Sequence, residues 1–160
     1  MFRTGIALAA VVVFAALPVD ARPEVKKSDS VVTVTATGDK IENDKQTVEI
    51  TIAIKEPWHL YANPVGNVDF ETAATDVTIT GKAKPASVKV DYPAGKVVMD
   101  STVGNYKIYE DKVVIKAVVQ RAKGDTEPLK ASIKLQACSI TKDGKSGTCL
   151  LPATVEVEVK

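Results

Sequence analysis

Two cysteines, Cys138 and Cys149, are the residues of this chain with the clearest capacity for chemistry. They are the only cysteines in the sequence, and a polar segment, residues 139–148, separates them. A close pair of this kind forms either a small structural disulfide or a redox couple that exchanges with other thiols. The short separation indicates that a disulfide between them would join the two arms of one β-hairpin.

The strand that precedes Cys138 predicts how accessible its sulfur is. Ile133, Leu135 and Ala137 alternate as a core-facing set, so Cys138 has the opposite phase and we expect its thiol near solvent. An accessible disulfide is exchangeable, and two lysines in the intervening loop could favour a thiolate. A closed loop of this size would, however, also stabilise the fold by about 3 kcal/mol. Exported cysteine pairs are most often structural, so both interpretations stay open on the residues alone.

Residues 1–21 predict export. Arg3 lies in a short basic start, an apolar run covers residues 5–17, and Val19-Asp20-Ala21 has the small residues of a cleavage site. The apolar run is too short to span a bilayer, although a retained anchor is the alternative. We therefore expect a signal peptide cleaved near Ala21 and a periplasmic or secreted protein.

The rest of the chain fits one domain. We expect residues 22–30 to be a flexible mature N-terminus and residues 31–160 to fold around one core. The 21 lysines and arginines nearly balance the 20 aspartates and glutamates, which gives no support to nucleic-acid binding. We expect a monomer.

Alternation with a period of two dominates the sequence and predicts β-strands. Only residues 67–75 could hold a short helical turn. Turn clusters rich in glycine, proline and aspartate separate the strands. The pattern predicts an all-β fold, an immunoglobulin-like antiparallel β-sandwich. The expected strands cover residues 32–37, 47–54, 77–80, 88–92, 113–120, 133–137 and 154–159.

Three segments carry a family resemblance: residues 54–64, which include Trp58-His59-Leu60-Tyr61, residues 104–111, and residues 136–152, which include both cysteines. In order and spacing these segments resemble the N-terminal periplasmic domain of the DsbD family of thiol:disulfide interchange proteins. The resemblance covers nearly all of the chain after residue 21. It implies an immunoglobulin-like sandwich whose cysteine pair takes electrons from a membrane thiol reductase and passes them to oxidised periplasmic proteins.

The resemblance also implies roles for individual residues. Cys149 would attack or be attacked by a thioredoxin-like or disulfide-isomerase-like partner, and Cys138 would be its resolving cysteine through a mixed disulfide. By position, His59 and Tyr61 match tyrosines that line the family's active site, and Asp100 would neighbour the thiols. The segment 100–104 matches a cap loop but has no aromatic residue, so shielding of the disulfide must be weaker or come from elsewhere.

Two further features differ from the family. The loop between the cysteines is longer than is usual there, which puts its geometry in question. The chain ends at Lys160, before the membrane segment and thioredoxin-like domain that follow in family proteins, so we expect a stand-alone domain that needs a separate electron donor.

Other chemistries receive little support from the sequence. His59 is the only histidine, so neither a Ser-His-Asp triad nor a copper site with two histidines can be assembled. A zinc site would need His59, both cysteines and a carboxylate without the usual spacing. We expect no cofactor. Trp58 is interpreted as a core anchor, and Tyr106 and Tyr109, which alternate irregularly for a strand, as residues packed under a loop.

Two functions therefore remain. The first is an exported thiol:disulfide interchange domain, a possible oxidoreductase, that works through Cys138 and Cys149. The second is a non-catalytic binding or interaction module in which the same disulfide is a permanent structural clip. The two hypotheses differ in reduction potential, because structural bridges lie below about −300 mV and exchangeable ones lie higher.

Overall fold

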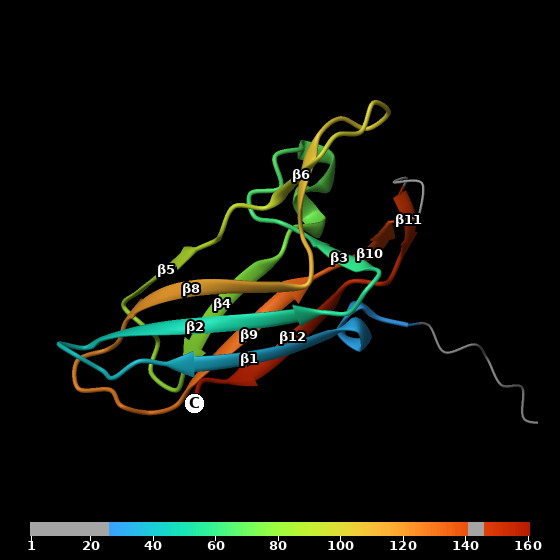
Figure 1. Cartoon of the computed structure of the whole chain (residues 1–160). Coiled ribbons are helices and arrows are strands. Elements are labelled where there is room, and N and C mark those ends of the chain that lie inside the picture. The colour runs from blue at the N-terminus through green and yellow to red at the C-terminus, as the bar shows by residue number, and fades with distance from the viewer. Residues whose placement is uncertain (1–25, 141–145) are drawn as a thin grey trace, which may run out of the picture.

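The computed structural model describes residues 26–140 and 146–160 (Figure 1). The expected signal peptide and the two loop lysines, Lys142 and Lys145, lie outside the described residues. Within them, no helix is long and apolar enough to cross a membrane.

A four-stranded and a three-stranded antiparallel sheet pack face to face and form the sandwich (Figure 1). The first has the order β1-β2-β8-β5, and the second has the order β12-β9-β4. Alternate side chains of both sheets point into one core, as the period of two predicts. The strand bounds are β1 Val32–Gly38, β2 Lys45–Ile54, β4 Asp76–Gly81, β5 Ser87–Asp91, β8 Lys112–Gln120, β9 Leu129–Leu135 and β12 Ala153–Glu158.

A five-stranded sheet, with the order β11-β10-β3-β7-β6, extends one end of the sandwich. Its strands continue those of the sandwich, because β2 leads into β3, β5 into β6 and β9 into β10, while β7 leads into β8. The chain therefore passes directly from strands of the main core into strands of the five-stranded sheet. Its strands are β3 Trp58–Tyr61, β6 Lys96–Val98, β7 Tyr106–Tyr109, β10 Ala137–Ile140 and β11 Ser146–Cys149.

Two short 3-10 helices complete the fold, η1 (Ser28–Val31) and η2 (Val68–Ala73). The second lies within the segment for which a helical turn was predicted. Ser28, which lies in the stretch expected to be flexible, is buried and donates from its hydroxyl to the carbonyl of Leu151 over 2.7 Å. Contacts of the domain thus begin before residue 31.

The predicted all-β, immunoglobulin-like sandwich is confirmed. Tyr106 and Tyr109, interpreted as residues packed under a loop, both lie on β7, a strand not identified from the sequence, and both are buried. Tyr109 packs in the main core, whereas Tyr106 belongs to a second cluster on the opposite side of the sheet. The irregular alternation arises because protein covers both faces of this strand.

Candidate functional site

The two cysteines form a disulfide that joins the two arms of the β10–β11 hairpin, as predicted. Cys138 and Cys149 are paired directly across the hairpin, with their Cα atoms 4.0 Å apart. The hairpin lies at the edge of the five-stranded sheet, and β11 is its outermost strand. One cysteine therefore lies on an inner strand and the other at the sheet edge.

The two sulfur-bearing residues have opposite environments. Cys138 is 1% exposed, whereas Cys149 is exposed. The expectation that Cys138 lies near solvent was wrong, although its phase was predicted correctly. Ala137 faces the main core and Cys138 faces the other side of the sheet, but that side is covered by a second hydrophobic cluster.

Strand β3 lies between β10 and β7 and contributes to both cores. Leu60 and the half-buried Trp58 pack with the main core, as the core-anchor interpretation of Trp58 predicted. His59 and Tyr61 have the opposite phase, and His59 is paired with Cys138 in the ladder. Residues paired directly across antiparallel strands share a face, so these side chains lie on the Cys138 side of the sheet.

Aromatic rings cover the buried cysteine. The Tyr61 and Phe70 rings are stacked, with centroids 5.0 Å apart, and the Tyr106 ring lies 5.0 Å from Phe70 and 5.9 Å from Tyr61. Phe70 belongs to η2, and Tyr106 belongs to β7. The shielding that segment 100–104 does not supply through an aromatic residue is thus supplied by η2.

Sequence reasoning missed Phe70 and Tyr106 as residues of this site. The available signal for Phe70 was an aromatic residue inside the predicted helical turn. The short helix does not by itself reveal which sheet face its ring covers, so this contact required the tertiary structure.

Tyr61 provides the polar group closest to the buried sulfur among the described contacts. Its hydroxyl lies 3.6 Å from Cys138 Sγ, and because a disulfide sulfur carries no hydrogen, the hydroxyl is the donor. Burial, with a smaller contribution from Tyr106, raises the pKa of Tyr61 above its ordinary value. The hydroxyl therefore keeps its proton at neutral pH and can donate to a thiolate formed at Cys138.

His59 is the second polar group beside the disulfide. Its side chain is buried at 3% exposure, and neither ring nitrogen has a hydrogen-bond partner among the described residues. Burial lowers the pKa of His59, and the negative charge of Glu110 acts in the opposite direction. The imidazole is therefore mainly neutral at pH 7, with one nitrogen able to donate and the other able to accept.

Asp100 is held by its own loop. Its carboxylate accepts hydrogen bonds from the backbone N–H groups of Thr102 and Val103, which lowers its pKa. No contact found among the described residues joins Asp100 to either cysteine. Its charge instead contributes to raising the pKa of Tyr106, after the larger effect of burial.

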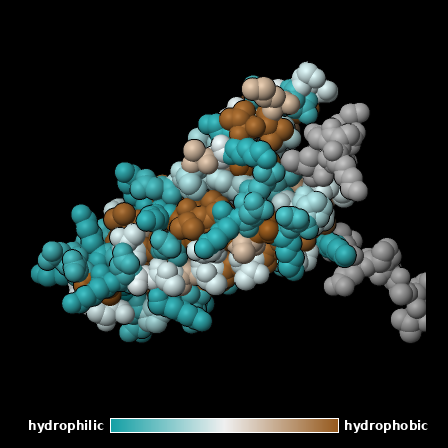
Figure 2. Space-filling model, in the orientation of Figure 1, coloured by the Kyte–Doolittle hydropathy of each residue, from teal (hydrophilic) through white to brown (hydrophobic). Residues whose placement is uncertain are grey.

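Helix η2 and the β6–β7 loop are connected above the cluster. The Asn67 side chain caps η2 by accepting from the Asp69 N–H, and its amide donates to the Val103 carbonyl over 2.8 Å. We call η2 and residues 99–104 together the cap. Its exposed apolar side chains are Val68, Met99 and Val103, and Figure 2 shows hydrophobic residues gathered at this end of the molecule.

Among the described residues, no three His, Cys, Asp or Glu side chains are grouped to hold a metal ion. A surface groove of about 660 Å³ lies at the other end of the sandwich, lined by residues such as Lys40, Glu42 and Gln120. It is remote from the disulfide, so the candidate site is the Cys138–Cys149 hairpin and its cover.

The fold of this chain is also found among solved structures. The N-terminal periplasmic domain of ScsB from Proteus mirabilis superposes with a TM-score of 0.58 at 14% identity, over 89% of this chain and 49% of that one. The chain thus spans about half the length of that structure. At this identity the similarity establishes the fold.

Two structures from Neisseria meningitidis show weaker similarity. The reduced DsbD N-terminal domain has a TM-score of 0.49 at 16% identity, covering 88% of this chain and 93% of that one. A complex between the DsbD and PilB N-terminal domains has a TM-score of 0.47 at 14% identity, covering 87% of each chain. No curated protein sequence matches the chain significantly.

The residues that match one protein family include every residue that the structure describes. The family described as thiol:disulfide interchange protein DsbD, N-terminal, matches residues 23–160. This range includes both cysteines, all three sheets and the cap. The chain therefore belongs to the family of N-terminal domains of the thiol:disulfide interchange protein DsbD.

Proposed function

We propose that this protein is a periplasmic thiol:disulfide interchange domain, which carries electrons between a membrane or thioredoxin-like donor and oxidised extracytoplasmic proteins through Cys138 and Cys149. The observation that carries the proposal is the asymmetry of the disulfide. One cysteine is exposed on an edge strand, and the other is buried beneath aromatic rings.

This asymmetry supports a particular order of exchange. A partner thiolate attacks Cys149 Sγ, the bond to Cys138 Sγ breaks, and Cys138 leaves with the electron pair as a thiolate. The hydroxyl of Tyr61, 3.6 Å from Cys138 Sγ, stabilises that charge. A second thiol of the partner then releases Cys149, which leaves the partner oxidised and the domain reduced.

The same steps run in reverse when the reduced domain meets an oxidised partner. Cys149 attacks the partner's disulfide, and Cys138 resolves the mixed disulfide that results. The exposed apolar side chains of the cap, Val68, Met99 and Val103, offer a contact surface for a thioredoxin-like partner that approaches Cys149.

The equilibrium reduction potential of the pair tests the proposal. We expect a value near or above about −250 mV in dithiothreitol buffers, read by thiol trapping and mass spectrometry. A value below about −300 mV, with a large loss of stability on reduction, would instead identify a structural clip.

Single-cysteine variants provide a matched control, since each removes the same disulfide. Cys138→Ser keeps the exposed Cys149 and should form a stable mixed disulfide with a thioredoxin-like protein that retains a single cysteine, activated beforehand as a mixed disulfide with thionitrobenzoate, which leaves as its thiolate. Cys149→Ser keeps only the buried sulfur and should accumulate at least tenfold less, because access limits exchange. Equal trapping by the two variants would contradict the assignment of Cys149 as the attacking residue.

A further inference from the structure

His59 lies in a row of residues that crosses the five-stranded sheet. Cys149 is paired with Cys138, and Cys138 is paired with His59 across β10 and β3. The register of β3 with β7 pairs Leu60 with Tyr109, so its continuation places Glu110 beside His59. His59 therefore lies between Cys138 on one neighbouring strand and Glu110 at the end of the other.

The hydrogen-bonding state of His59 is unusual for a residue so deeply buried. Buried polar groups are nearly always hydrogen-bonded, because leaving one without a partner costs free energy. Both nitrogens of this imidazole are without partners among the described residues while the neighbouring sulfurs are joined in a disulfide. Reduction of that disulfide would create a thiol on the adjacent strand, which is the kind of partner that the ring lacks.

The distance between the two positions permits such a contact. Residues directly opposite in an antiparallel pair have Cβ atoms about 4.5–5.5 Å apart, which side-chain rotation can convert to hydrogen-bond range. The charged and titratable groups placed near His59 include Cys138 of β10 with Cys149 beyond it on β11, Tyr61 from its own strand, and Glu110 after β7. Glu110 is itself paired with Lys96 of β6 over 2.6 Å.

We propose that His59 accepts the proton of the Cys138 thiol when this buried sulfur resolves the mixed disulfide. The proton moves from Cys138 Sγ to a ring nitrogen, and the thiolate attacks Cys149 Sγ. The Cys138–Cys149 bond forms, the bond from Cys149 to the partner breaks, and the partner sulfur leaves with the electron pair as a thiolate. In the reverse direction the imidazolium returns its proton to Cys138.

The inference rests on the proposed function, in which the buried Cys138 must act as a nucleophile. A thiol in apolar surroundings resists ionisation, so burial alone would make Cys138 a slow nucleophile. Tyr61 can stabilise the thiolate by donating a hydrogen bond, but at neutral pH its hydroxyl does not accept the proton. His59 is the group on this face that is neutral and has an acceptor nitrogen, and Glu110 favours the imidazolium that results.

The imidazole itself provides the first test, because His59 is the only histidine of the chain. In tag-free protein, NMR of the ring gives one set of histidine signals, which can be titrated in the disulfide and dithiol forms. We expect the imidazole pKa to be higher in the dithiol form. The same titration curve in both forms would overturn the proposal, and this experiment requires no variant.

The thiol provides the second test. In the Cys149→Ser background, thiolate absorbance against pH reports Cys138 alone. We expect His59→Phe to raise the pKa of this thiol and, with both cysteines present, to slow resolution of the mixed disulfide at pH 7 at least tenfold. Glu110→Gln should also raise the thiol pKa and slow the resolution, each by less than His59→Phe does. Trp58 is next to His59 but faces the main core, so Trp58→Phe should leave the thiol pKa unchanged.

The outcomes separate the two proposals. Failure of the unaltered protein to exchange with a reduced thioredoxin-like protein would contradict the proposed function. Normal exchange together with an unchanged thiol pKa in folded His59→Phe protein would contradict only the role of His59. His59→Gln serves as the second variant, since its amide can form hydrogen bonds but cannot take up the proton at neutral pH.

Discussion

Arg121 and His59 are buried polar residues near opposite ends of strand β8, and they differ in their hydrogen bonding. Each is 3% exposed. The guanidinium of Arg121 is surrounded by acceptors, whereas the imidazole of His59 has no hydrogen-bond partner among the described residues. Their similar burial makes the difference in hydrogen bonding informative.

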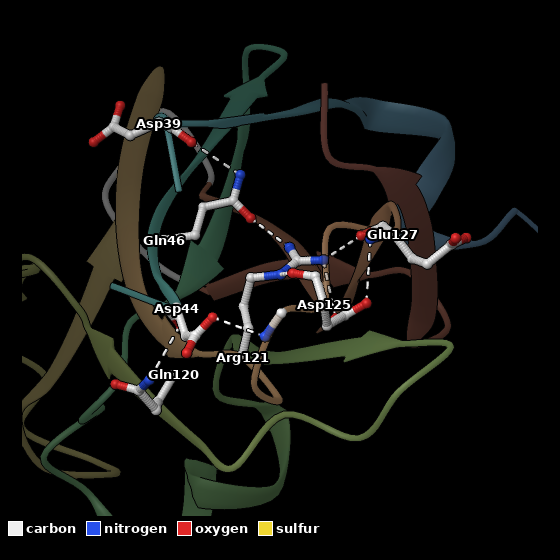
Figure 3. Close-up of polar contacts among 8 residues, drawn as sticks. Asp39, Asp44, Gln46, Gln120, Arg121, Asp125 and Glu127 are labelled. Carbon is white, nitrogen blue, oxygen red and sulfur yellow. Dashed lines mark hydrogen bonds and ion pairs between the residues drawn. The ribbon is translucent and has the colours of Figure 1, made fainter. Parts of the chain in front are cut away.

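The Arg121 guanidinium donates four hydrogen bonds to neighbouring residues (Figure 3). The guanidinium donates to the Asp125 carbonyl over 2.8 Å, to Gln46 Oε1 over 2.6 Å and to Asp125 Oδ2 over 3.1 Å. It also donates to the Glu127 carbonyl. Asp44 joins the same network by accepting from the Gly124 N–H over 2.9 Å. These contacts connect the β1–β2 turn to the loop after β8.

The comparison sets a structural site beside the site that we propose to be reactive. Extensive hydrogen bonding stabilises a buried charge in a single arrangement, which suits a connection between loops. Incomplete bonding leaves a group able to change its partners and its protonation state, which suits a site where sulfur chemistry alters the surroundings. Substitutions at the first end should therefore affect stability alone, and substitutions at the second should also affect the thiols.

The largest effect on stability is expected at the Arg121 end. Asp125→Ala leaves a buried guanidinium without its carboxylate and should destabilise the protein by about 3–5 kcal/mol, measured by urea unfolding. The exposed Asp91, whose Lys89 partner is 3.9 Å away, is the matched control, and Asp91→Ala should change stability by less than about 0.5 kcal/mol. A changed reduction potential of the Cys138–Cys149 pair in Asp125→Ala would contradict the view that the Arg121 end affects stability alone.

Removal of the aromatic cover should have the next largest effect. Phe70 is half-buried and stacked on Tyr61, so Phe70→Ala should cost about 2 kcal/mol and expose Cys138. We expect the Cys138 thiol in the reduced protein to react faster with an alkylating reagent. Phe70→Leu restores most of the side-chain volume, so its Cys138 thiol should react more slowly than that of Phe70→Ala. Equal rates in the unaltered protein and both variants would show that Phe70 does not shield this sulfur.

Loss of a single hydroxyl should have a smaller effect. Tyr61→Phe should cost about 1 kcal/mol and raise the thiol pKa of Cys138, because the thiolate loses its donor. Tyr109→Phe is the control on the opposite face, since the Tyr109 hydroxyl donates to the Pro93 carbonyl over 3.0 Å. It should lower stability without moving the thiol pKa, and a shift of equal size in both variants would contradict the role of Tyr61.

The smallest effect is the response of stability to pH. Burial lowers the pKa of His59 in the folded disulfide form below the value of about 6.5 expected when unfolded. Below that value the unfolded chain binds more protons at this position, so stability falls as the pH is lowered through about 6.5 toward the folded pKa. Unfolding of the oxidised protein from pH 7.5 to 5 should show this loss, and His59→Phe should reduce it.

Much of the fold could be predicted because strand formation depends on local alternation. The runs at residues 32–37, 47–54 and 113–120 correspond to β1, β2 and β8 within a few residues at either end. The hairpin that joins Cys138 to Cys149 was equally local, since the residues are close in the chain. Strands β6 and β7 were missed, because they are short and lie outside the clear alternating runs.

The sequence by itself determined the alternating strands, the phase of Cys138 relative to Ala137, and the types of side chain available for thiol chemistry. The tertiary structure alone decided that the second face of β10 is covered, which buries Cys138 and leaves Cys149 accessible. The physical reason is that alternation specifies which face a side chain occupies but not what packs against that face. Here the cover comes from Phe70 and Tyr106, which are distant from the cysteines in the chain.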